Sequence, residues 1–537
     1  MARTKSDTIR EVTTDYLSQI NVLSPPPPAQ IEADILDQLQ VAFDVENQIR
    51  PKYPWRPLEK LIPAQIADII MTLYPVASVA CAGEDADRSY DLLCIYQSEG
   101  DDEGIYVSDE TKIEDLAREY CYMITKKEAE EVLHILKTRA PRKFRCNNHN
   151  LIAVNNGIFD YETKQLLPFS PDYVFIAKSR VNVNPQAKNV VIHNDEDGTD
   201  WDVESWMNDL FDDPEIIDLM WQIIGAIVRP NVPWGKSAWF YSTSGNNGKG
   251  TLCELMRQIC GKGTYASISL SDFGRDFMLE PLTRASAIIV DENDVGTYID
   301  KAANLKAVIT QDVIQMNRKF KSPIAFQFKG FMVQCLNEMP KIRDKSDSFY
   351  RRQIFVPFTK CFTGAERKYI KQDYLKRPEV LEYVLWKVLN TNYYTLSTPK
   401  TCELALNEYK EFNDPVRQFL AEILPELTWD LVPFSFLYDL YIAWYHKNVG
   451  KGDTMSRQSF IQNLETLLKN YPEWVCEDKT KKYKPAGRMD RPEPLIAEYG
   501  LKDWMNPMFM SSTDVNKKCI PMLKTNYRGF LRVQQNP

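Results

Sequence analysis

The spacing of hydrophobic residues predicts alternating strands and helices in the middle of the chain. The segment "LCELMRQICG" places Leu252, Leu255, Met256 and Ile259 at intervals of three and four residues, as a helix with one buried face does. The runs "SAWFYS", "ASAIIVDEND" and "FKGFMVQCLNE" are short and apolar, which is typical of buried strands. Strands that alternate with helices over residues 237–360 predict an α/β fold with a mainly parallel sheet covered on both faces.

The patterns on either side of this core differ from it and from each other. A helical pattern, with Ile31, Ile35, Leu39 and Phe43 at helical spacing, follows the proline run "SPPPP" near the start of the chain. Short strands mixed with helices follow from about residue 80. After about residue 400 the pattern becomes helical again. We therefore divide the chain into an N-terminal helical and linker region (1–75), a mixed α/β domain (76–230), the α/β core (231–400) and a mainly helical C-terminal domain (405–537).

Composition and charge are those of an ordinary globular protein. The 537 residues are 44% hydrophobic and 26% charged, with a net charge of −9, so any contact with nucleic acid must come from local basic patches. The eleven cysteines form no CxxC pair, which favours reduced buried thiols over a zinc ribbon. No apolar run is long enough to span a bilayer and the N-terminus lacks a signal peptide, so we expect a cytoplasmic protein without membrane contact.

The segment "GNNGKGT" lies between a predicted strand and a predicted helix, where a phosphate-binding loop is expected. Backbone N–H groups at the start of the helix can surround a β-phosphate, and Lys249 can reach the β- and γ-phosphates. The predicted nucleotide-binding residues are Gly245, Asn246, Asn247, Gly248, Lys249, Gly250 and Thr251. Taken alone, the segment is also compatible with a surface Gly-Asn turn.

This loop departs from the usual phosphate-loop pattern at two positions. Gly250 stands directly after the lysine, where a serine or threonine hydroxyl normally binds Mg²⁺. Thr251 follows, so either its hydroxyl or a water molecule would have to take that place. Thr243 also stands where the first glycine of the pattern is expected.

Polar residues end the strands that follow the loop. Asp291 and Glu292 end "AIIVDE", where one carboxylate can hold hydrated Mg²⁺ and the next can deprotonate the attacking water. Asn337 ends a further strand and can contact the γ-phosphate, and Arg351 and Arg352 precede the strand "QIFVPF". Taken alone, each feature is also compatible with a structural role without catalysis, as an acidic loop, a turn asparagine or a solvated arginine pair.

Two segments are basic enough to contact DNA. Residues 301–360 contain twelve Lys or Arg against four Asp or Glu, and Lys319, Phe320 and Lys321 combine cations with an aromatic ring. In the C-terminal domain, Ser456 can cap a helix that begins with Arg457. The stretch "DKTKKYKPAGR", which includes Lys481 and Lys482, follows this helix. A helix followed by a basic hairpin predicts a winged helix that binds duplex DNA, and a helical packing domain with a solvated loop is the alternative.

Together these motifs resemble superfamily 3 helicases, in particular the phage and plasmid primase-helicase family that includes the poxvirus primase-helicase. The residues that carry the resemblance are "GNNGKGT", "IIVDEND", "LKAVITQDVIQMNRKFK", "QCLNEMP" and "RRQIFVPF". The resemblance implies an AAA+-type P-loop ATPase core that binds ATP and Mg²⁺ between the subunits of a homohexameric ring. Thr251 and Asp291 are the expected metal ligands. The segment "MNRKFKSPIAF" would be the hairpin that contacts single-stranded DNA in the central channel.

The resemblance also implies which residues act within a subunit and which across an interface. Lys249, Asp291, Glu292 and Asn337 would act in the subunit that binds ATP. Arg352 would be the arginine finger of the neighbouring subunit, with Arg351 as the second candidate. Lys306 would face the neighbour's nucleotide. A ring of seven subunits is the alternative to six.

The expected function is that of an ATP-dependent replicative DNA helicase, and of a replication initiator, encoded by a phage, plasmid or mobile island of a bacterial host. The ring would translocate on single-stranded DNA, and the C-terminal domain would bind duplex origin DNA. The alternative is a nucleotide-binding initiator or scaffold without robust turnover. A metabolic P-loop kinase explains the basic hairpin and the large flanking domains poorly.

Overall fold

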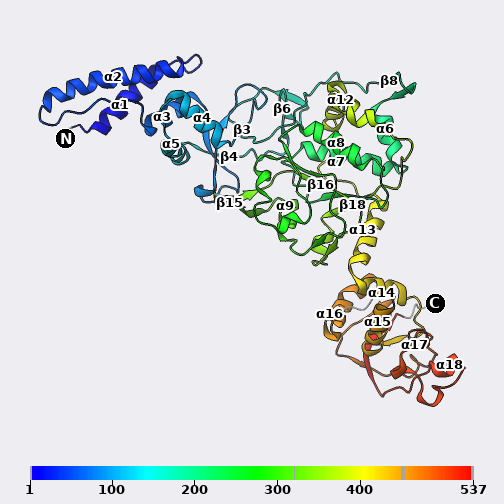
Figure 1. Ribbon diagram of the computed structural model, residues 1–537. Helices are drawn as coiled ribbons and strands as arrows, with labels where there is room; N and C mark the ends of the chain where they lie inside the picture. The colour runs from blue at the N-terminus through cyan, green and yellow to red at the C-terminus, as the bar shows by residue number, and fades with distance from the viewer. Residues whose placement is uncertain (1–2, 320, 449–453, 534–537) are drawn as a thin grey trace. The chain divides into compact units, whose positions relative to one another are not determined.

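The computed structural model describes residues 3–319, 321–448 and 454–533 (Figure 1). Contacts divide the chain into two compact units, residues 1–405 and 406–537. Within the described ranges, every helix is too short or too polar to cross a membrane.

Three helices begin the first unit. They are α1 (Lys5–Gln19), α2 (Pro28–Ile49) and α3 (Pro63–Leu73). The helix α2 begins at the last proline of the proline run, since a proline needs no hydrogen-bond partner in the first helical turn. The predicted apolar positions of α2, Ile31, Ile35, Leu39 and Phe43, are all buried, so the helical pattern is confirmed.

A small sheet with strand order β3-β2-β1-β4 follows the three helices. Its strands are β1 (Val76–Ala80), β2 (Leu92–Tyr96), β3 (Tyr106–Val107) and β4 (Arg142–Phe144), and its helices are α4 (Glu110–Tyr120) and α5 (Lys126–Arg139). The antiparallel pair β2–β3 encloses an acidic turn. Arg142 donates to the buried carboxylate of Asp91 through both Nε (2.8 Å) and Nη2 (3.2 Å), which ties β4 to the sheet.

Short antiparallel strands and two helices connect this sheet to the core. The strands are β5 (Leu151–Val154), β6 (Gly157–Asp160), β7 (Gln165–Leu167), β8 (Ile192–Asn194) and β9 (Thr199–Trp201). The helices are α6 (Val203–Leu210) and α7 (Pro214–Val228). The two helices are separate because Asp213 caps α7, whose first residue is a proline.

A five-stranded sheet with strand order β11-β12-β16-β10-β18 forms the centre of the first unit. Its strands are β10 (Ser237–Tyr241), β11 (Tyr265–Ala266), β12 (Ala287–Val290), β16 (Phe331–Leu336) and β18 (Gln353–Pro357). Every neighbouring pair is parallel, so the predicted α/β fold with a parallel sheet is confirmed. The carboxyl ends of all five strands therefore meet at one edge.

Helices cover one face of this sheet. The helices α7, α8 (Lys249–Cys260) and α12 (Pro378–Leu389) pack on one another, and their apolar residues share one core with Ala238, Phe240, Ile289 and Val333 of the sheet. On the other face, the ring of Trp239 packs edge-on against Phe349 of α10 (Asp347–Tyr350) at 6.0 Å.

Smaller elements surround the core. They are α9 (Ala303–Thr310), the short parallel pair β13 (Tyr298–Ile299) and β17 (Lys341–Ile342), and α11 (Lys368–Gln372). Strands β14 (Val313–Arg318) and β15 (Lys321–Gln327) form an antiparallel hairpin where the sequence predicts one. Phe320 lies outside the described residues.

The second unit contains more sheet than its sequence pattern suggests. Its helices are α14 (Pro415–Ile423), α15 (Phe434–Asn448), α16 (Arg457–Leu467), α17 (Leu495–Glu498) and α18 (Val515–Lys518), and α13 (Lys400–Asn413) crosses the division between units. Its strands are β19 (Leu431–Pro433), β20 (Trp474–Val475), β21 (Lys482–Tyr483) and β22 (Tyr527–Arg532). The strand β22 pairs antiparallel with each of the other three. Three of these strands have only two or three residues, too few to show an alternating pattern.

Candidate functional site

The predicted phosphate loop occupies residues 242–248, between β10 and α8. Gly248 adopts a φ of +87°, and a Cβ there would lie 2.6 Å from Cδ2 of Leu210, so only glycine suits this position. Asn246 accepts a hydrogen bond from the backbone of Phe362 (2.7 Å) through its carbonyl, and its side-chain amide donates to Glu366 (2.5 Å). The loop is thus held in a defined conformation by the segment that follows β18.

Lys249 is the first residue of α8, and its side chain is buried beneath this loop. Only 5% of the residue is exposed, and Nζ donates to Oδ1 of Asn337 (3.1 Å) and to the carbonyl of Ser242 (3.4 Å). Burial lowers the pKa of Lys249, although the neighbouring Cys335, Cys253 and Asp291 act in the opposite direction. Among the ion pairs of the described residues none involves Lys249. A buried ammonium group without a carboxylate partner is suited to receive an anion.

Asp291 follows β12 and lies beside the first turn of α8. A Cβ on Gly250 would lie 2.9 Å from Oδ1 of Asp291, so position 250 is the one that faces this carboxylate. The other oxygen, Oδ2, lies 3.5 Å from Nη1 of Arg257 and 3.8 Å from Nζ of Lys371. The glycine after Lys249 therefore makes room for Asp291.

The predicted residues Glu292 and Thr251 have different surroundings. Glu292, the next residue after Asp291, is exposed at the carboxyl edge of the sheet. Thr251 lines a cavity together with Asn246 and Gly248. The structure thus brings Lys249, Asp291 and Asn337 together and places Thr251 on the cavity wall.

This cavity has a volume of about 540 Å³ and lies next to the phosphate loop. Trp201, Trp206 and Phe362 supply apolar surface. Basic residues from the segment that includes α11, namely Arg367, Lys368 and Lys371, line another part of it. Its size, its aromatic surface and its cations are those of a site for an anionic ligand with an apolar part.

The two arginines before β18 differ in their surroundings. Arg351 is exposed, whereas Arg352 is half-buried and donates from Nη1 to the hydroxyl (2.8 Å) and the carbonyl of Ser348. Lys306, on α9, donates to Oδ2 of Asp344 (2.6 Å). Burial raises the pKa of Asp344, but hydrogen bonds from Lys306 and Ser346 outweigh it and leave that pKa below its usual value. These residues lie outside the contacts that join Lys249, Asp291 and Asn337.

The predicted DNA-contacting residues are distributed over both units. In the first, Lys319 is exposed in the turn of the β14–β15 hairpin, and Lys321 begins β15. In the second, Arg457 is exposed at the start of α16, where the Ser456 hydroxyl accepts the N–H of Ser459 (3.2 Å), so the predicted helix cap is confirmed.

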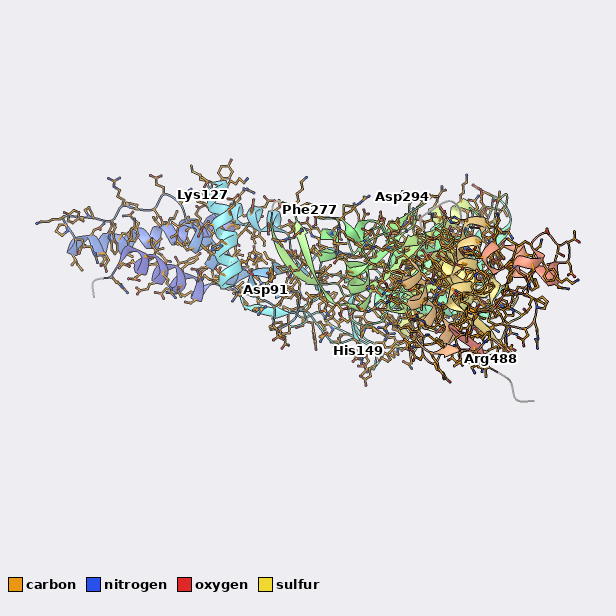
Figure 2. All side chains as sticks on the ribbon, turned by 90° about the horizontal axis from the view of Figure 1, so that it is seen from below. Asp91, Lys127, His149, Phe277, Asp294 and Arg488 are labelled. Carbon is orange, nitrogen blue, oxygen red and sulfur yellow. The ribbon has the colours of Figure 1, made fainter. Side chains whose placement is uncertain are left out.

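The basic stretch of the second unit combines paired and unpaired positions. Lys481 contacts Oε2 of Glu477 (2.6 Å), and Lys479 contacts Oε2 of Glu465 (3.0 Å). Lys482 lies in β21 directly opposite Arg528 of β22, and both are exposed. Arg488, at the end of the stretch, lies on the surface of this unit (Figure 2).

Several residues around the site were not singled out from the sequence. Asn293 is 4% exposed, donates to Gln334 (2.9 Å) and to the Cys335 carbonyl (3.0 Å), and accepts from the backbone of Leu270 (2.9 Å). It fixes the turn that carries Asp291 and Glu292. The only sequence signal for it is its place in "DEND". Arg257, Lys371 and the aromatic residues of the cavity carry no recognisable signal, because they come from segments outside the motifs.

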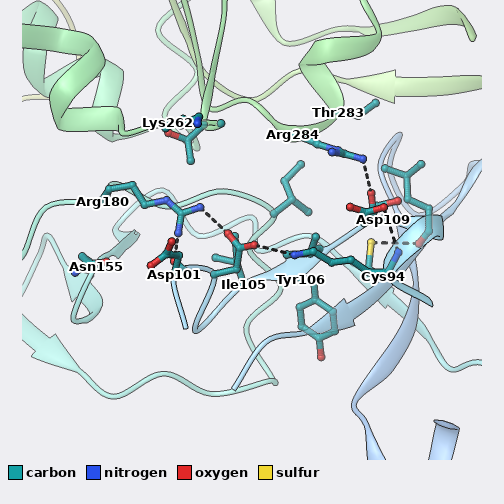
Figure 3. A pocket seen from close by; sticks show the side chains of 18 residues that line it. Cys94, Asp101, Ile105, Tyr106, Asp109, Asn155, Arg180, Lys262, Thr283 and Arg284 are labelled. Carbon is teal, nitrogen blue, oxygen red and sulfur yellow. Dashed lines mark hydrogen bonds and ion pairs between the residues drawn. The ribbon is translucent and has the colours of Figure 1, made fainter. Parts of the chain in front are cut away.

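A second cavity, of about 670 Å³, lies between the β1–β4 sheet and the core and includes no residue of the phosphate loop (Figure 3). Both of its arginines already have partners within the protein. Arg180 contacts Asp102 (2.6 Å) and the Asp101 carbonyl, and Nη2 of Arg284 donates to the Ser108 carbonyl (3.1 Å). The cavity beside the phosphate loop is therefore the better candidate for a phosphate-containing ligand.

Comparisons with known proteins give two family matches, one in each unit. Residues 240–352, which contain the phosphate loop and the strand-end motifs, match a family described as "Family of unknown function (DUF5906)". Residues 411–493, in the second unit, match a family described as "Poxvirus D5 protein-like". The second match lies outside the motifs from which the resemblance to the poxvirus primase-helicase was drawn, and it confirms that resemblance independently.

Solved structures give a more distant likeness. The apo structure of the NrS-1 C-terminal region is 14% identical, covers 80% of this chain and 98% of its own, and has a TM-score of 0.43. An A-form apo structure of the same region is also 14% identical and covers 88% of this chain and 100% of its own, with a TM-score of 0.43. No curated protein matches the sequence.

Proposed function

We propose that this chain is an ATP-dependent DNA helicase and replication initiator that acts as a ring. The observation that carries the proposal is the buried Lys249 amine, which contacts Asn337 at 3.1 Å and has no ion-pair partner in the described parts of the chain. It lies at the N-terminus of α8 and at the carboxyl edge of a parallel sheet, where phosphates bind in α/β folds.

The residues at this edge would each have a separate role in phosphoryl transfer. Lys249 would contact the β- and γ-phosphates, and the exposed carboxylate of Glu292 would accept the proton of the attacking water. Asn337, which already contacts Lys249, would orient that water near the γ-phosphate. The cavity beside Thr251 would hold the base and ribose of ATP against Trp201 and Phe362.

Asp291 is the residue best placed to hold Mg²⁺, which when bound would neutralise charge on the phosphates. Gly250 leaves the space in front of its carboxylate open, and this space suits a metal-bound water in place of the usual serine or threonine hydroxyl. Thr251 would then contribute to the nucleotide cavity rather than to the metal.

We propose an AAA+-type ring in which the neighbouring subunit completes the site. The exposed Arg351 and the half-buried Arg352 both lie at the start of β18, next to the strand that leads into the phosphate loop. The contacts of Arg352 with Ser348 restrict its reach, so exposure favours Arg351 as the finger. Lys306, held by Asp344, would lie at the same interface.

DNA would contact both units. The basic β14–β15 hairpin of the first unit would follow single-stranded DNA in the channel. In the second unit, α14, β19, α15, α16 and β20 follow one another, and β22 lies between β19 and β20 in the sheet. This arrangement supports a winged helix for duplex DNA, with β21, α17 and α18 inserted before β22. Lys482 and Arg528 form a cross-strand pair of like charge, which is unfavourable unless an anion such as a DNA phosphate lies nearby.

The match of residues 411–493 to the poxvirus D5 protein-like family supports a role in replication, because primase-helicases of this kind are replication proteins. Steady-state ATP hydrolysis by the full chain, with and without single-stranded DNA, tests the proposal. We expect DNA to stimulate hydrolysis and Glu292→Gln to abolish it. Hydrolysis that DNA leaves unchanged would refute a DNA-coupled motor.

Mixed rings test the arrangement of subunits. Arg351→Ala and Arg352→Ala are each mixed with Glu292→Gln, so that an interface between two different chains can contain both intact groups. We expect the true finger variant to be inactive alone and to recover activity in the mixture. A variant whose mixtures stay inactive at every ratio is not the finger.

One observation favours a second candidate function, that of a nucleotide-binding initiator without robust turnover. The position that faces Asp291 carries no hydroxyl, because Gly250 stands there. Tight ATP binding by the full chain, with no hydrolysis in the presence or absence of DNA, would support this candidate and exclude the motor.

A further inference from the structure

Two cysteines lie directly behind the lysine and the asparagine of the phosphate site. Cys253 follows Lys249 by one helical turn on α8, so the two lie on one face of that helix. Cys335 lies on β16, two residues before Asn337, which directly follows the strand. The Lys249–Asn337 contact is therefore followed by a second contact between the same two elements, in which the sulfurs of Cys253 and Cys335 are 3.3 Å apart.

Asp291 completes a group of three ligand atoms. Its strand, β12, is the parallel neighbour of β16, and Val290 pairs with Gln334, so Asp291 lies next to Cys335. The two sulfurs and a carboxylate oxygen of Asp291 all lie within 4.8 Å of one another. Both cysteines are buried, whereas the Asp291 side chain is 36% exposed, so an ion can approach from the carboxylate side.

We propose that Cys253, Cys335 and Asp291 form a binding site for a soft divalent metal ion such as Zn²⁺. Cysteine thiolates and aspartate carboxylates both bind Zn²⁺, with bonds of about 2.0–2.3 Å, and a site with three protein ligands leaves the fourth position open to water. In a tetrahedral site with such bonds the two sulfurs would be about 3.8 Å apart, so they need to move apart by only about half an ångström.

The same three residues distinguish this ion from Mg²⁺. Mg²⁺ accepts oxygen ligands and would use Asp291 alone, whereas Zn²⁺ prefers the two sulfurs as well. Binding releases one proton from each thiol, which balances the two charges of the ion. The site therefore gains no net positive charge beside Lys249 and Arg257.

The effect of Zn²⁺ on ATP hydrolysis rests on the proposed function, whereas the metal site itself does not. An ion held by both sulfurs and Asp291 removes that carboxylate from its role with Mg²⁺ and the nucleotide. Zn²⁺ would therefore inhibit ATP hydrolysis, and excess Mg²⁺ would relieve the inhibition poorly because it cannot replace Zn²⁺ on sulfur.

Cobalt binding tests the site without nucleotide or turnover. The full chain, kept reduced with a phosphine, is titrated with Co²⁺ while the thiolate-to-cobalt absorption band is recorded. We expect one equivalent to bind and Zn²⁺ to displace it. Cys253→Ser and Cys335→Ser should each lose the band, and Asp291→Asn should weaken binding by more than about tenfold, since even the loss of an outer partner of a metal ligand costs that much.

Two other cysteines provide controls for the cobalt titration. Cys260 is buried on the same helix, and Cys361 is exposed, so the variants Cys260→Ser and Cys361→Ser should keep the band. Absence of the band in the unmodified chain, or its persistence in Cys253→Ser and Cys335→Ser, would overturn the proposal. Thermal unfolding checks that each variant is folded, and Cys253→Ala replaces Cys253→Ser if the serine variant is not.

Inhibition separates the failure of this site from the failure of the proposed function. If the cobalt band behaves as expected but the chain does not hydrolyse ATP, the metal site stands and the motor does not. If the chain hydrolyses ATP and Zn²⁺ inhibits Cys253→Ser as strongly as the unmodified chain, the inhibitory role of the site is refuted.

Discussion

Lys249 and Lys481 show two opposite ways in which this protein holds a lysine in a candidate binding region. Lys249 is 5% exposed, and its amine contacts only an amide and a carbonyl oxygen among the hydrogen bonds described. The side chain of Lys481 is 51% exposed and contacts the carboxylate of Glu477. The buried lysine has lost most of its water and forms no ion pair in the described part of the chain, whereas the exposed one keeps both water and a paired carboxylate.

This difference indicates where each region obtains its affinity. A phosphate that reaches Lys249 replaces lost hydration with a charge-assisted hydrogen bond in a partly buried site, so one contact has a large effect. A phosphate that reaches the basic stretch of the second unit must compete with Glu477, with water and with salt. We therefore expect a few large effects at the phosphate site and many small ones on the basic surface.

The largest expected effect is that of Lys249→Ala. Hydrolysis should fall by about 10²–10³-fold, because the variant loses a preformed contact to the transferring phosphate. The variant should unfold at an equal or higher temperature, because it no longer buries a charge without a partner. Steady-state kinetics and thermal unfolding without nucleotide measure the two effects. Lys262→Ala, an exposed lysine just after the same helix, is the control, and an equal loss of activity there would contradict the comparison.

Asn293→Ala should have the next largest effect, this time on stability. Its side chain makes three hydrogen bonds in a buried turn, and its loss leaves Gln334 and the Leu270 N–H without that partner. We expect a loss of about 1–3 kcal/mol in the free energy of unfolding, with hydrolysis reduced because Asp291 and Glu292 lose their support. Chemical denaturation measures the first effect. The nearby Asp294 lies on the surface (Figure 2), and Asp294→Ala should leave stability nearly unchanged.

Gly250→Ser should lower activity although it restores the usual residue after the lysine. The new Cβ would lie 2.9 Å from Oδ1 of Asp291, so the carboxylate must shift. We expect a loss of about tenfold in kcat, because small displacements of a catalytic group are costly. Gly245→Ser, in the same loop, meets no atom within 4 Å and should cost less. Higher activity in Gly250→Ser would show that the missing hydroxyl, and not the space for Asp291, limits this site.

Much of the phosphate site follows from sequence because its parts lie at the ends of recognisable elements. The apolar spacing of α8, the glycine that ends it and the strands before Asp291 and Asn337 all have local signals. The face on which Thr251 lies has none, because it depends on how α8 is rotated against β12. The cations of α11 and the aromatic ring of Trp201 reach the cavity only through tertiary packing.

In the second unit, less of the structure could be predicted from the sequence. Its helices and the Ser456 cap follow from local patterns, but its sheet does not. The strand β21 has two residues and pairs with β22, which lies more than forty residues later in the chain. No local signal connects segments so far apart, so the position of Arg528 beside Lys482 could not be predicted.

The smallest expected effects are those of Lys482→Ala and Arg528→Ala on duplex binding. Each should reduce the slope of log affinity against log salt concentration by about one, because each removes one phosphate contact. Fluorescence anisotropy with duplex DNA at several salt concentrations measures the slope. Lys481→Ala, next to Lys482 but paired with Glu477, is the matched control and should change the slope less. Equal slopes for the unmodified chain and for Lys482→Ala would show that the β21–β22 pair does not contact DNA. The exposed helix face at Arg457 would then be the next surface to test.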